Sequence, residues 1–447
     1  MTLSATLYDL TATQAARLVR DRTVSPVELV EALLARGRAV DGRVLAWETL
    51  DADGALRAAR GAEAALAAGP GAPLGPLHGV PFGVKDIFDT AGLRTAAGFM
   101  PYDGRIPTAD AAPVAHFKRA GAVLLGKTVT TQFAQADPPR TRNPWSAERT
   151  PGGSSSGSAA GVAAREMPLA LGSQTAGSVL RPAAYNGVVG FKPTYGRVGK
   201  QGVLPLAWTL DHVGILARAV ADCRLFLDVV ENPSPRPAAP PRDAAASVSV
   251  PPRLGLLTPA VERAQLRVAD HVREVARTFA AAGATVVDVT LEHDLDVILA
   301  VHHVVMQTEA AAIHWQLLEQ YPGAHAPRLR AYVEVGRLLP GAAYLHAQRL
   351  RRDIRRDLLR AVESVDALLL PTASDVAPMA ATTGDPSLQA PFSLVGFPAV
   401  SLPSGVLASD ALPLAVQVVG APWQDPRLLA VAEWCERQLP PMPAPPL

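Results

Sequence analysis

Three observations on this 447-residue sequence predict an α/β fold. Hydrophobic residues make up 49% of the chain, which is enough apolar material for a large core. Apolar residues alternate at Val80, Phe82 and Val84, with the period of a β-strand. Residues 254–257, 268–279 and 285–289 follow a strand–helix–strand pattern. Strands and helices are therefore expected in both halves of the chain.

The first part of the chain, residues 1–70, is expected to be helical. Ser25 to Glu28 read as a capping box with Pro26 at the first helical position, and apolar residues follow on one helix face. The strand near residue 80 then brings Lys85 to its end. A helix over 114–119 and a strand over 122–126 come next.

Residues 71–230 form the expected core, and residues 150–202 within it are rich in glycine and serine, which suits close backbone approach. Residues 231–253 are a proline- and alanine-rich connection without an apolar period. Residues 254–447 return to α/β, with a mostly helical region over 300–364. Short strands are expected at 365–370, 399–402 and 414–419, bounded by Pro371, Pro403 and Pro413. We expect one domain over 1–447.

Composition argues against several classes of function. The 42 basic residues balance 41 acidic ones, so the net charge gives no support for a nucleic-acid partner or an acidic membrane surface. Cys223 and Cys435 are far apart in sequence and lie outside any CxxC pattern, which argues against a disulfide scaffold or a zinc or iron–sulfur site. Neither a leader pattern nor a run of about 18 apolar residues is visible. A cytoplasmic protein is expected.

Lysine is scarce, with only Lys85, Lys118, Lys127, Lys192 and Lys200 among the 42 basic residues. Lysine can lose its proton inside a protein, whereas arginine effectively cannot. Base composition could explain this preference for arginine without any chemistry, but the few lysines retained are worth inspecting for acid–base roles.

The glycine- and serine-rich run over 152–158 allows three interpretations. As a phosphate loop it lacks the lysine, because Ser158 stands at that position. As a G-x-S-x-G nucleophile elbow it would make Ser155 the nucleophile, but no buried strand precedes it. The third interpretation is a structural loop.

A second run, Gln174 to Ala183, follows an apolar segment and contains Ser178. Such a turn can aim several N–H groups at one point beside a serine, as an oxyanion hole requires, or it can be an ordinary strand-to-helix turn. The ten scattered histidines offer no obvious base for this serine. Lysine is the known substitute where burial lowers its pKa from about 10.4 towards neutrality.

Five segments, in order along the chain, resemble the amidase signature family: residues 79–86, 151–160, 175–178, 190–197 and 396–403. The resemblance implies a large mixed central β-sheet flanked by α-helices on both faces. It also implies a Ser-cisSer-Lys triad, in which Ser178 is the nucleophile, Ser154 the bridging serine after a cis peptide bond, and Lys85 the base. The backbone N–H groups of Thr175, Ala176, Gly177 and Ser178 would form the oxyanion hole. No metal and no cofactor are implied.

The second serine segment departs from the pattern of many family members at three places. Gln174 replaces an aspartate, Ala176 replaces a glycine, and Arg181 stands three rather than two residues after the serine. This form is similar to the branch of malonamidase-like enzymes and bacterial urethanases. Gln174 and Arg181 are candidate substrate-binding residues, although Arg181 could equally tie the turn to the protein body.

The resemblance implies an amidohydrolase that cleaves a small linear amide, or a related carbamate or ester, through a serine acyl-enzyme. Its expected partner is that small molecule, with no nucleic acid and no membrane, and a homodimer is compatible. Substrate choice is expected in residues 301–346 and 128–138. The alternative is the glutaminase-type component of a tRNA-dependent amidotransferase complex, against which Gln174 and the position of Arg181 count. A noncatalytic binding protein is a third hypothesis.

Overall fold

An eleven-stranded mixed β-sheet forms the centre of the computed structural model, which describes residues 7–67, 74–230 and 251–447. The strand order is β1-β3-β2-β4-β6-β5-β10-β11-β9-β7-β8. The strands are β1 (Trp47–Leu50), β2 (Pro81–Lys85), β3 (Val123–Thr128), β4 (Leu169–Gln174), β5 (Val189–Lys192), β6 (His212–Ala217), β7 (Arg253–Leu257), β8 (Thr285–Val289), β9 (Ala367–Pro371), β10 (Ala399–Leu407) and β11 (Leu412–Val419).

The sheet combines parallel and antiparallel pairs. Strand β2 runs parallel to β3 and β4, and β7 runs parallel to β8 and β9, whereas the pairs from β4 through β6, β5, β10 and β11 to β9 are antiparallel. Strands from both sides of the proline-rich connection join this one sheet. The predicted mixed α/β fold is confirmed.

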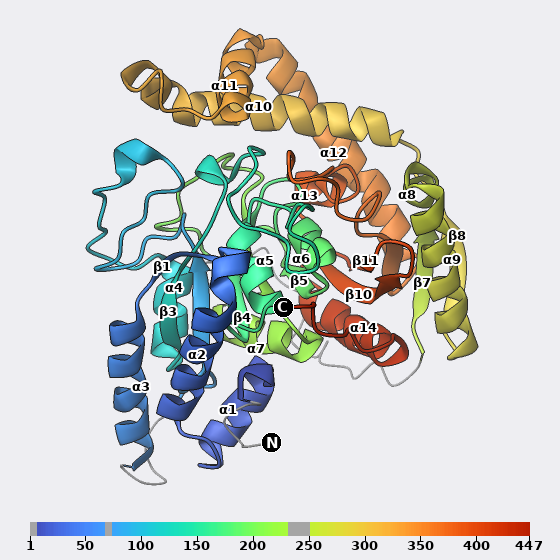
Figure 1. Ribbon diagram of the computed structural model, residues 1–447. Helices are drawn as coiled ribbons and strands as arrows, with labels where there is room; N and C mark the ends of the chain where they lie inside the picture. The colour runs from blue at the N-terminus through green and yellow to red at the C-terminus, as the bar shows by residue number, and fades with distance from the viewer. Residues whose placement is uncertain (1–6, 68–73, 231–250) are drawn as a thin grey trace.

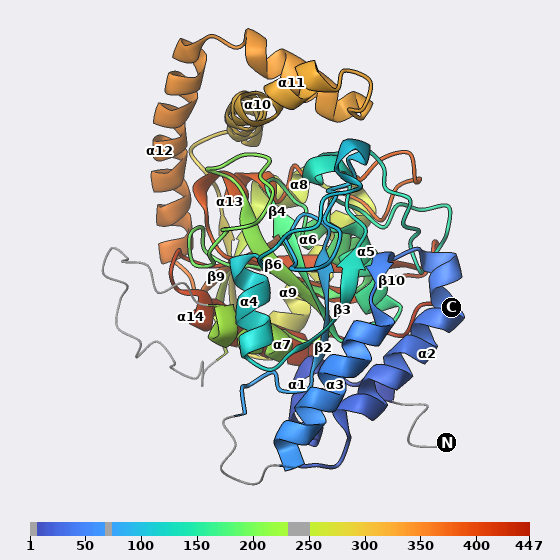
Figure 2. The same cartoon turned by 90° about the vertical axis from the view of Figure 1, so that its left-hand side faces the viewer.

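Helices pack on both faces of the sheet (Figures 1 and 2). Helices α5 and α6 contact each other and the central strands, while α7 and α14 form another contacting pair that packs on β6, β10 and β11. The helices are α1 (Ala12–Arg20), α2 (Pro26–Val44), α3 (Ala52–Ala67), α4 (Ala112–Arg119), α5 (Ser156–Ala163), α6 (Leu180–Asn186), α7 (Val220–Val230), α8 (Thr258–Arg263), α9 (Leu266–Ala281), α10 (Leu295–Gln320), α11 (Pro327–Leu338), α12 (Gly341–Glu363), α13 (Ala390–Val395) and α14 (Asp425–Gln438).

The helical region expected over 300–364 is a group of three long helices, α10, α11 and α12. Helix α10 contacts both α11 and α12, and α12 also contacts β9. Helices α10 and α11 form the upper part of the molecule in Figure 1. Helix α10 also contacts α13. Within the described ranges, no helix has both the length and the apolar composition needed to cross a membrane.

The N-terminal helices begin as the sequence predicts, but they do not account for the whole segment. The Ser25 hydroxyl accepts a hydrogen bond from the Val27 N–H, and the Ser25 N–H donates to the Glu28 carboxylate, which completes the predicted capping box. Between α2 and α3 the chain forms β1, which pairs antiparallel with β3. The expectation of helices alone over 1–70 is therefore wrong, because a four-residue edge strand is too short to show a period of two.

Two of the proline boundaries are also wrong. Pro403 lies within β10 opposite Ala415, and Pro413 lies within β11 opposite Val406. Beyond Ser401, β10 pairs only with β11, and before Val416, β11 pairs only with β10. Each proline therefore sits where its strand has one neighbour, so the missing N–H removes no bond to a second strand.

The predicted connection over 231–253 lies mostly outside the described residues, which resume at Pro251.

The small residues of α5 allow this helix to pack very close to its neighbours. All eight are buried, and a Cβ added at Gly157 would lie 2.2 Å from the Ala46 carbonyl oxygen and 2.5 Å from the Val129 nitrogen. This helix therefore approaches the chain beside β1 and β3 more closely than any larger residue would allow.

Candidate active site

Lys85 is the last residue of β2 and is completely buried. Its Nζ lies 2.7 Å from Ser154 Oγ, 2.8 Å from Ser173 Oγ and 3.2 Å from Ser155 Oγ. No salt bridge to Lys85 is found among the described residues. The amine is thus surrounded by three hydroxyl groups, any of which can accept or donate a hydrogen bond.

Burial lowers the pKa of Lys85 well below its ordinary value, since the charged amine loses its hydration and gains no carboxylate contact. The negative charge of Asp211 acts in the opposite direction and raises this pKa by a smaller amount. The arrangement favours the neutral amine, which is the form that can accept a proton.

Ser154 precedes α5 and is 1% exposed. The Gly153–Ser154 peptide bond is cis, as the resemblance implies. The Gly153 carbonyl accepts a hydrogen bond of 2.7 Å from the Arg181 guanidinium, and the Ser154 carbonyl accepts one of 3.4 Å from the Thr131 N–H. The peptide is therefore tied on both sides to parts of the chain that lie far from it in sequence.

Ser178 lies in the turn between β4 and α6, and its side chain lines a cavity of about 150 Å³. Its carbonyl oxygen accepts a hydrogen bond of 3.3 Å from the Ser155 N–H, which places the two serine segments side by side. Within the described chain, the Ser178 hydroxyl makes no hydrogen bond to another protein group. The hydroxyl is therefore available to a molecule in the cavity.

Ser155, the nucleophile of the alternative elbow interpretation, is completely buried and does not line this cavity. Its hydroxyl donates to the Ser173 carbonyl and contacts Lys85. Ser155 therefore contacts Lys85 and the Ser173 backbone from within the protein and does not face the cavity.

Gln174 ends β4 and caps the helix that follows. Its Oε1 accepts hydrogen bonds from the N–H groups of Val179 and Leu180, and its Nε2 donates to Ser393, whose hydroxyl in turn donates to the Ala176 carbonyl. The side chain is completely buried and lies outside the cavity wall. We therefore interpret Gln174 as a residue that shapes the turn rather than one that touches substrate.

Ala176 and Gly177 complete the turn. Ala176 is absent from the residues with positive φ, so its backbone is ordinary and its Cβ adds no strain. A Cβ at Gly177 would lie 2.3 Å from Gln389 Oε1, so glycine permits a close approach there. The N–H groups of Thr175 to Ser178 remain the candidate oxyanion donors.

Arg181 contacts the protein and the cavity at once. Its Nη2 donates a hydrogen bond to the Gly153 carbonyl and lies 3.3 Å from the Thr383 hydroxyl. These contacts tie the turn to the protein body, which is one of the two roles considered for Arg181 from the sequence. The residue also lines the cavity, its Nε has no hydrogen-bond partner, and no described carboxylate forms a salt bridge with it. Burial lowers its pKa. An anionic ligand would supply the negative charge that this guanidinium lacks among its described neighbours.

Part of the remaining cavity wall comes from the two regions in which substrate choice was expected, and part comes from Leu206, Thr383, Gly384 and Pro386, which lie outside both regions. Ala134, Gln135 and Ala136 lie in the first region, and His303, Met306 and Tyr332 in the second. Phe133 and Ala134 have positive φ values of 46° and 62°. Non-glycine residues in this conformation are uncommon and cluster at functional sites.

Sequence inspection did not single out Ser173, Asp211 and His302, nor the cavity-lining residues Leu206, Thr383, Gly384 and Pro386. Ser173 belongs to no recognisable motif, but β4 is parallel to β2, so both strands end at the same edge of the sheet and Ser173 meets Lys85 there. Asp211 accepts a hydrogen bond of 2.6 Å from the Thr175 hydroxyl. His302 Nε2 lies 3.1 Å from the Thr175 carbonyl oxygen. Only the assembled sheet shows these proximities.

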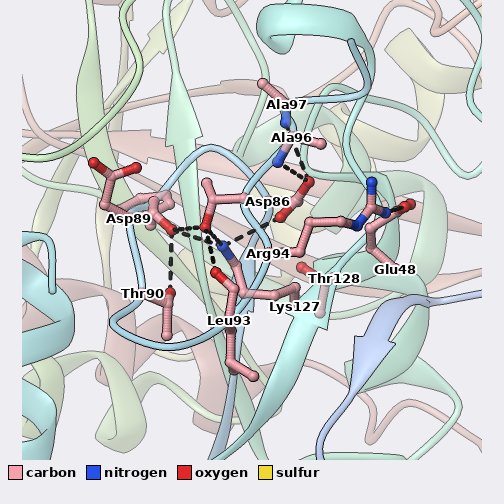
Figure 3. A network of polar contacts seen from close by, with 12 residues as sticks. Glu48, Asp86, Asp89, Thr90, Leu93, Arg94, Ala96, Ala97, Lys127 and Thr128 are labelled. Carbon is pink, nitrogen blue, oxygen red and sulfur yellow. Dashed lines mark hydrogen bonds and ion pairs between the residues drawn. The ribbon is translucent and has the colours of Figure 1, made fainter. Parts of the chain in front are cut away.

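A second buried lysine, Lys127, lies on β3, the strand beside β2, and Figure 3 shows the polar network around it. Lys127 Nζ is 3.2 Å from Asp86 Oδ1 and donates to the Phe88 carbonyl and the Thr95 hydroxyl. Asp86 Oδ2 accepts hydrogen bonds from the N–H groups of Ala96 and Ala97. The network fixes the loop that leaves β2 directly after Lys85.

No cluster of three or more histidine, cysteine, aspartate or glutamate side chains within the described ranges is placed to hold a metal ion. Cys223 and Cys435 are buried and unpaired.

Comparison with known proteins identifies the family. The Amidase family model matches residues 28–429. The chain belongs to the amidase family. A crystal structure described as an amidase superposes with a TM-score of 0.87 at 32% identity, covering 96% of this chain and all of the other.

Two further relatives carry a more specific name. The glutamyl-tRNA(Gln) amidotransferase A subunit of Roseiflexus castenholzii is 36% identical, over 96% of each chain. The structure of the protein of that name from Thermotoga maritima superposes with a TM-score of 0.80 at 26% identity, covering 98% of each chain.

These relatives contradict two expectations: hydrolysis of a small linear amide or carbamate by a stand-alone enzyme, and the absence of a nucleic-acid partner. The structure accounts for the first difference, and what a net charge measures accounts for the second. Gln174 counted against an amidotransferase component, yet its side chain caps α6 and does not reach the cavity. A net charge of +1 describes the field of this chain alone, and in a multi-protein complex another component can bind the nucleic acid.

Proposed function

We propose that this chain is the ammonia-releasing component of a glutamyl-tRNA(Gln) amidotransferase complex, and that it hydrolyses the side-chain amide of glutamine. The observation that carries the proposal is the 36% identity to the A subunit of such an enzyme over 96% of both chains. The amidase family membership supplies the general chemistry, which is cleavage of an amide bond.

In this proposal Ser178 is the nucleophile, Ser154 the relay and Lys85 the base. A charged lysine can donate three hydrogen bonds, but a neutral one donates two and accepts one. With three hydroxyls within 3.2 Å, a neutral Lys85 therefore accepts a hydrogen bond from one of them. We assign that donor to Ser154, because it makes the shortest of the three contacts and directly precedes Ser155, whose N–H binds the Ser178 carbonyl.

The reaction then proceeds in two halves. Ser178 Oγ bonds to the amide carbon while its proton moves to Ser154 and the Ser154 proton moves to Lys85. The C–N bond breaks, the nitrogen takes a proton back through the same relay, and ammonia leaves a glutamyl ester on Ser178. Water attacks this ester in the same way and releases glutamate, which restores Ser178. Backbone N–H groups among residues 175–178 stabilise the oxyanion, at about 3–4 kcal/mol per effective donor.

The cavity suits a small substrate with an anionic group. Its volume is about 150 Å³, and the buried guanidinium of Arg181 lines it without a carboxylate partner among the described residues. The α-carboxylate of glutamine would supply that partner through charge-assisted hydrogen bonds. Arg181 would then bind substrate as well as hold the Gly153 carbonyl.

The test measures glutamate and ammonia released from glutamine by the chain alone and by the chain combined with the other components of a glutamyl-tRNA(Gln) amidotransferase and glutamyl-tRNA(Gln). We expect turnover in the complex and its loss in the Ser178→Ala variant, with the fold unchanged by circular dichroism.

Propionamide and ethyl carbamate are assayed in parallel. They also test the resemblance to the malonamidase and urethanase branch and the urethanase side activity, which stay predictions, as does the esterase side activity. Efficient cleavage of these two compounds by the isolated chain, with no turnover of glutamine in any combination, would overturn the proposal.

A further inference from the structure

Asp211 lies directly before β6, at the point where this strand pairs with the end of β4. Gln174 is opposite His212 in that antiparallel pair, so Asp211 is next to Thr175, the first residue of the turn that contains Ser178. The Thr175 hydroxyl donates to Asp211 Oδ1 at 2.6 Å. The other carboxylate oxygen accepts hydrogen bonds of 2.9 and 3.0 Å from the N–H groups of Leu206 and Ala207.

This one carboxylate connects two walls of the cavity. Thr175 and Leu206 both line the cavity beside Ser178, and both are held by Asp211. The Thr175 carbonyl is held separately by His302 of α10, at 3.1 Å. Because a carbonyl only accepts, His302 donates from Nε2, and its pKa is lowered to about 4, so it is neutral there. The first candidate oxyanion residue is thus fixed through its side chain and through its backbone.

Asp211 also acts on Lys85 through its charge. It is the acid that opposes the effect of burial on the pKa of that amine. Burial raises the pKa of Asp211 itself, whereas its hydrogen bonds from Thr175, Leu206 and Ala207 and the charge of Lys200 lower it. Burial also lowers the pKa of His212 far below its usual range, so that side chain is neutral. The carboxyl group that holds the nucleophile turn is therefore also the acid whose ionised form acts on the candidate base.

We infer that Asp211 is a positioning residue for the reaction at Ser178: its carboxyl group holds the Thr175 side chain on one wall of the cavity and the Leu206 and Ala207 backbone on the other. This inference rests on the proposed acyl-enzyme chemistry but not on the identity of the substrate. A merely structural Asp211 would fix residues 205–211 and leave the acid–base behaviour of Lys85 unchanged.

The experiment separates charge from hydrogen bonding. Asp211→Asn keeps the size of the side chain and removes the charge, whereas Thr175→Val keeps the charge and removes the hydroxyl that Asp211 holds. The readout is the rate at which a fluorophosphonate probe labels Ser178 between pH 5 and 10. Labelling reports the activated nucleophile without needing glutamine, tRNA or partner proteins.

For Asp211→Asn we expect the acid limb of the labelling profile to move to lower pH, because loss of the negative charge makes Lys85 easier to deprotonate. For Thr175→Val we expect an unmoved acid limb and a plateau rate lowered about tenfold, as for the loss of one hydrogen bond. Thr175→Ser restores the hydroxyl and should regain the rate. Asp270→Asn, an exposed change on α9, should match the wild type.

Each outcome has one meaning. A wild-type chain that is not labelled at Ser178 refutes the proposed nucleophile. If the wild type is labelled normally and the acid limb does not move in Asp211→Asn, the inference that the charge of Asp211 acts on Lys85 is overturned. Equal plateau rates for Thr175→Val and Thr175→Ser overturn the positioning role, and that pair decides it even where Asp211→Asn does not fold.

Discussion

Lys85 and Lys127 lie one register position apart on neighbouring parallel strands, yet only Lys127 has an acidic partner. In the pair of β2 and β3, Val84 is opposite Lys127 and Lys85 is opposite Thr128. Lys127 contacts Asp86 at 3.2 Å (Figure 3), whereas Lys85 is surrounded by the hydroxyls of Ser154, Ser155 and Ser173. Both amines are completely buried. The difference in partners separates a structural cation from a candidate base.

Replacement of Lys85 by arginine tests this distinction. Arginine keeps a donor group but cannot give up its proton, so Lys85→Arg should lower Ser178 labelling and glutamine hydrolysis by about 10²- to 10⁴-fold. In the wild type, activity should rise with pH as Lys85 loses its proton, and burial places that rise well below pH 10.5. Lys118→Arg on α4 serves as the control. A Lys85→Arg chain within tenfold of the wild type would be incompatible with a lysine base.

The Asp86–Lys127 ion pair should contribute to stability only as a pair. Asp86→Asn leaves a buried amine facing an amide and should lower the free energy of unfolding by about 3–5 kcal/mol. The double variant Asp86→Asn with Lys127→Met removes the unpaired charge and should recover most of the loss. Urea unfolding of the three proteins measures both values. Equal stabilities of the single and double variants would show that the charge of Lys127 is compensated elsewhere.

Sequence alone locates the candidate triad but not its surroundings. Lys85, Ser154 and Ser178 stand in segments whose order and residue types resemble the family, so their numbers can be given without a structure. Ser173 and Asp211 belong to no such segment. They reach the site because β4 lies between β2 and β6, and this order depends on contacts between distant parts of the chain.

In the fold, too, local units could be predicted from the sequence, whereas pairings between distant strands could not. The strand–helix–strand unit of β7, α9 and β8 is local and was predicted, whereas the neighbours β5 and β10 are separated by some two hundred residues. Gln174 shows how a substitution can mislead. Its residue type indicated another substrate branch, but in the fold its amide caps α6, a role that sequence cannot distinguish from substrate binding.

The close approach of α5 predicts a contrast between two glycines. Gly157→Ala places a Cβ 2.2 Å from the Ala46 carbonyl oxygen and 2.5 Å from the Val129 nitrogen. Both are backbone atoms, so we expect the free energy of unfolding to fall by about 1–3 kcal/mol or more. Gly42→Ala, near the end of α2, meets nothing within 4 Å and should stabilise the chain by about 0.5–1 kcal/mol. Urea unfolding measures both. Equal effects at the two positions would contradict the packing described for α5.

Glu166 should make stability depend on pH. Its carboxylate is buried and accepts a hydrogen bond of 2.7 Å from the Trp47 indole, and burial raises its pKa well above the ordinary value of 4.5. Between these two pKa values the folded chain holds a proton that the unfolded chain has released. Stability therefore falls as pH rises from about 4.5, by up to roughly 1.4 kcal/mol per pH unit from this group.

Glu166→Gln keeps an acceptor for Trp47 and removes the titration. Thermal or urea unfolding from pH 5 to 8 should show the variant gaining stability over the wild type as pH increases, because only the wild type must retain a proton or bury a charge. Glu31→Gln, at an exposed position on α2, should follow the wild type at every pH. A constant difference between Glu166→Gln and the wild type across this range would mean that Glu166 is charged in the folded chain at pH 5, against the direction set by its burial.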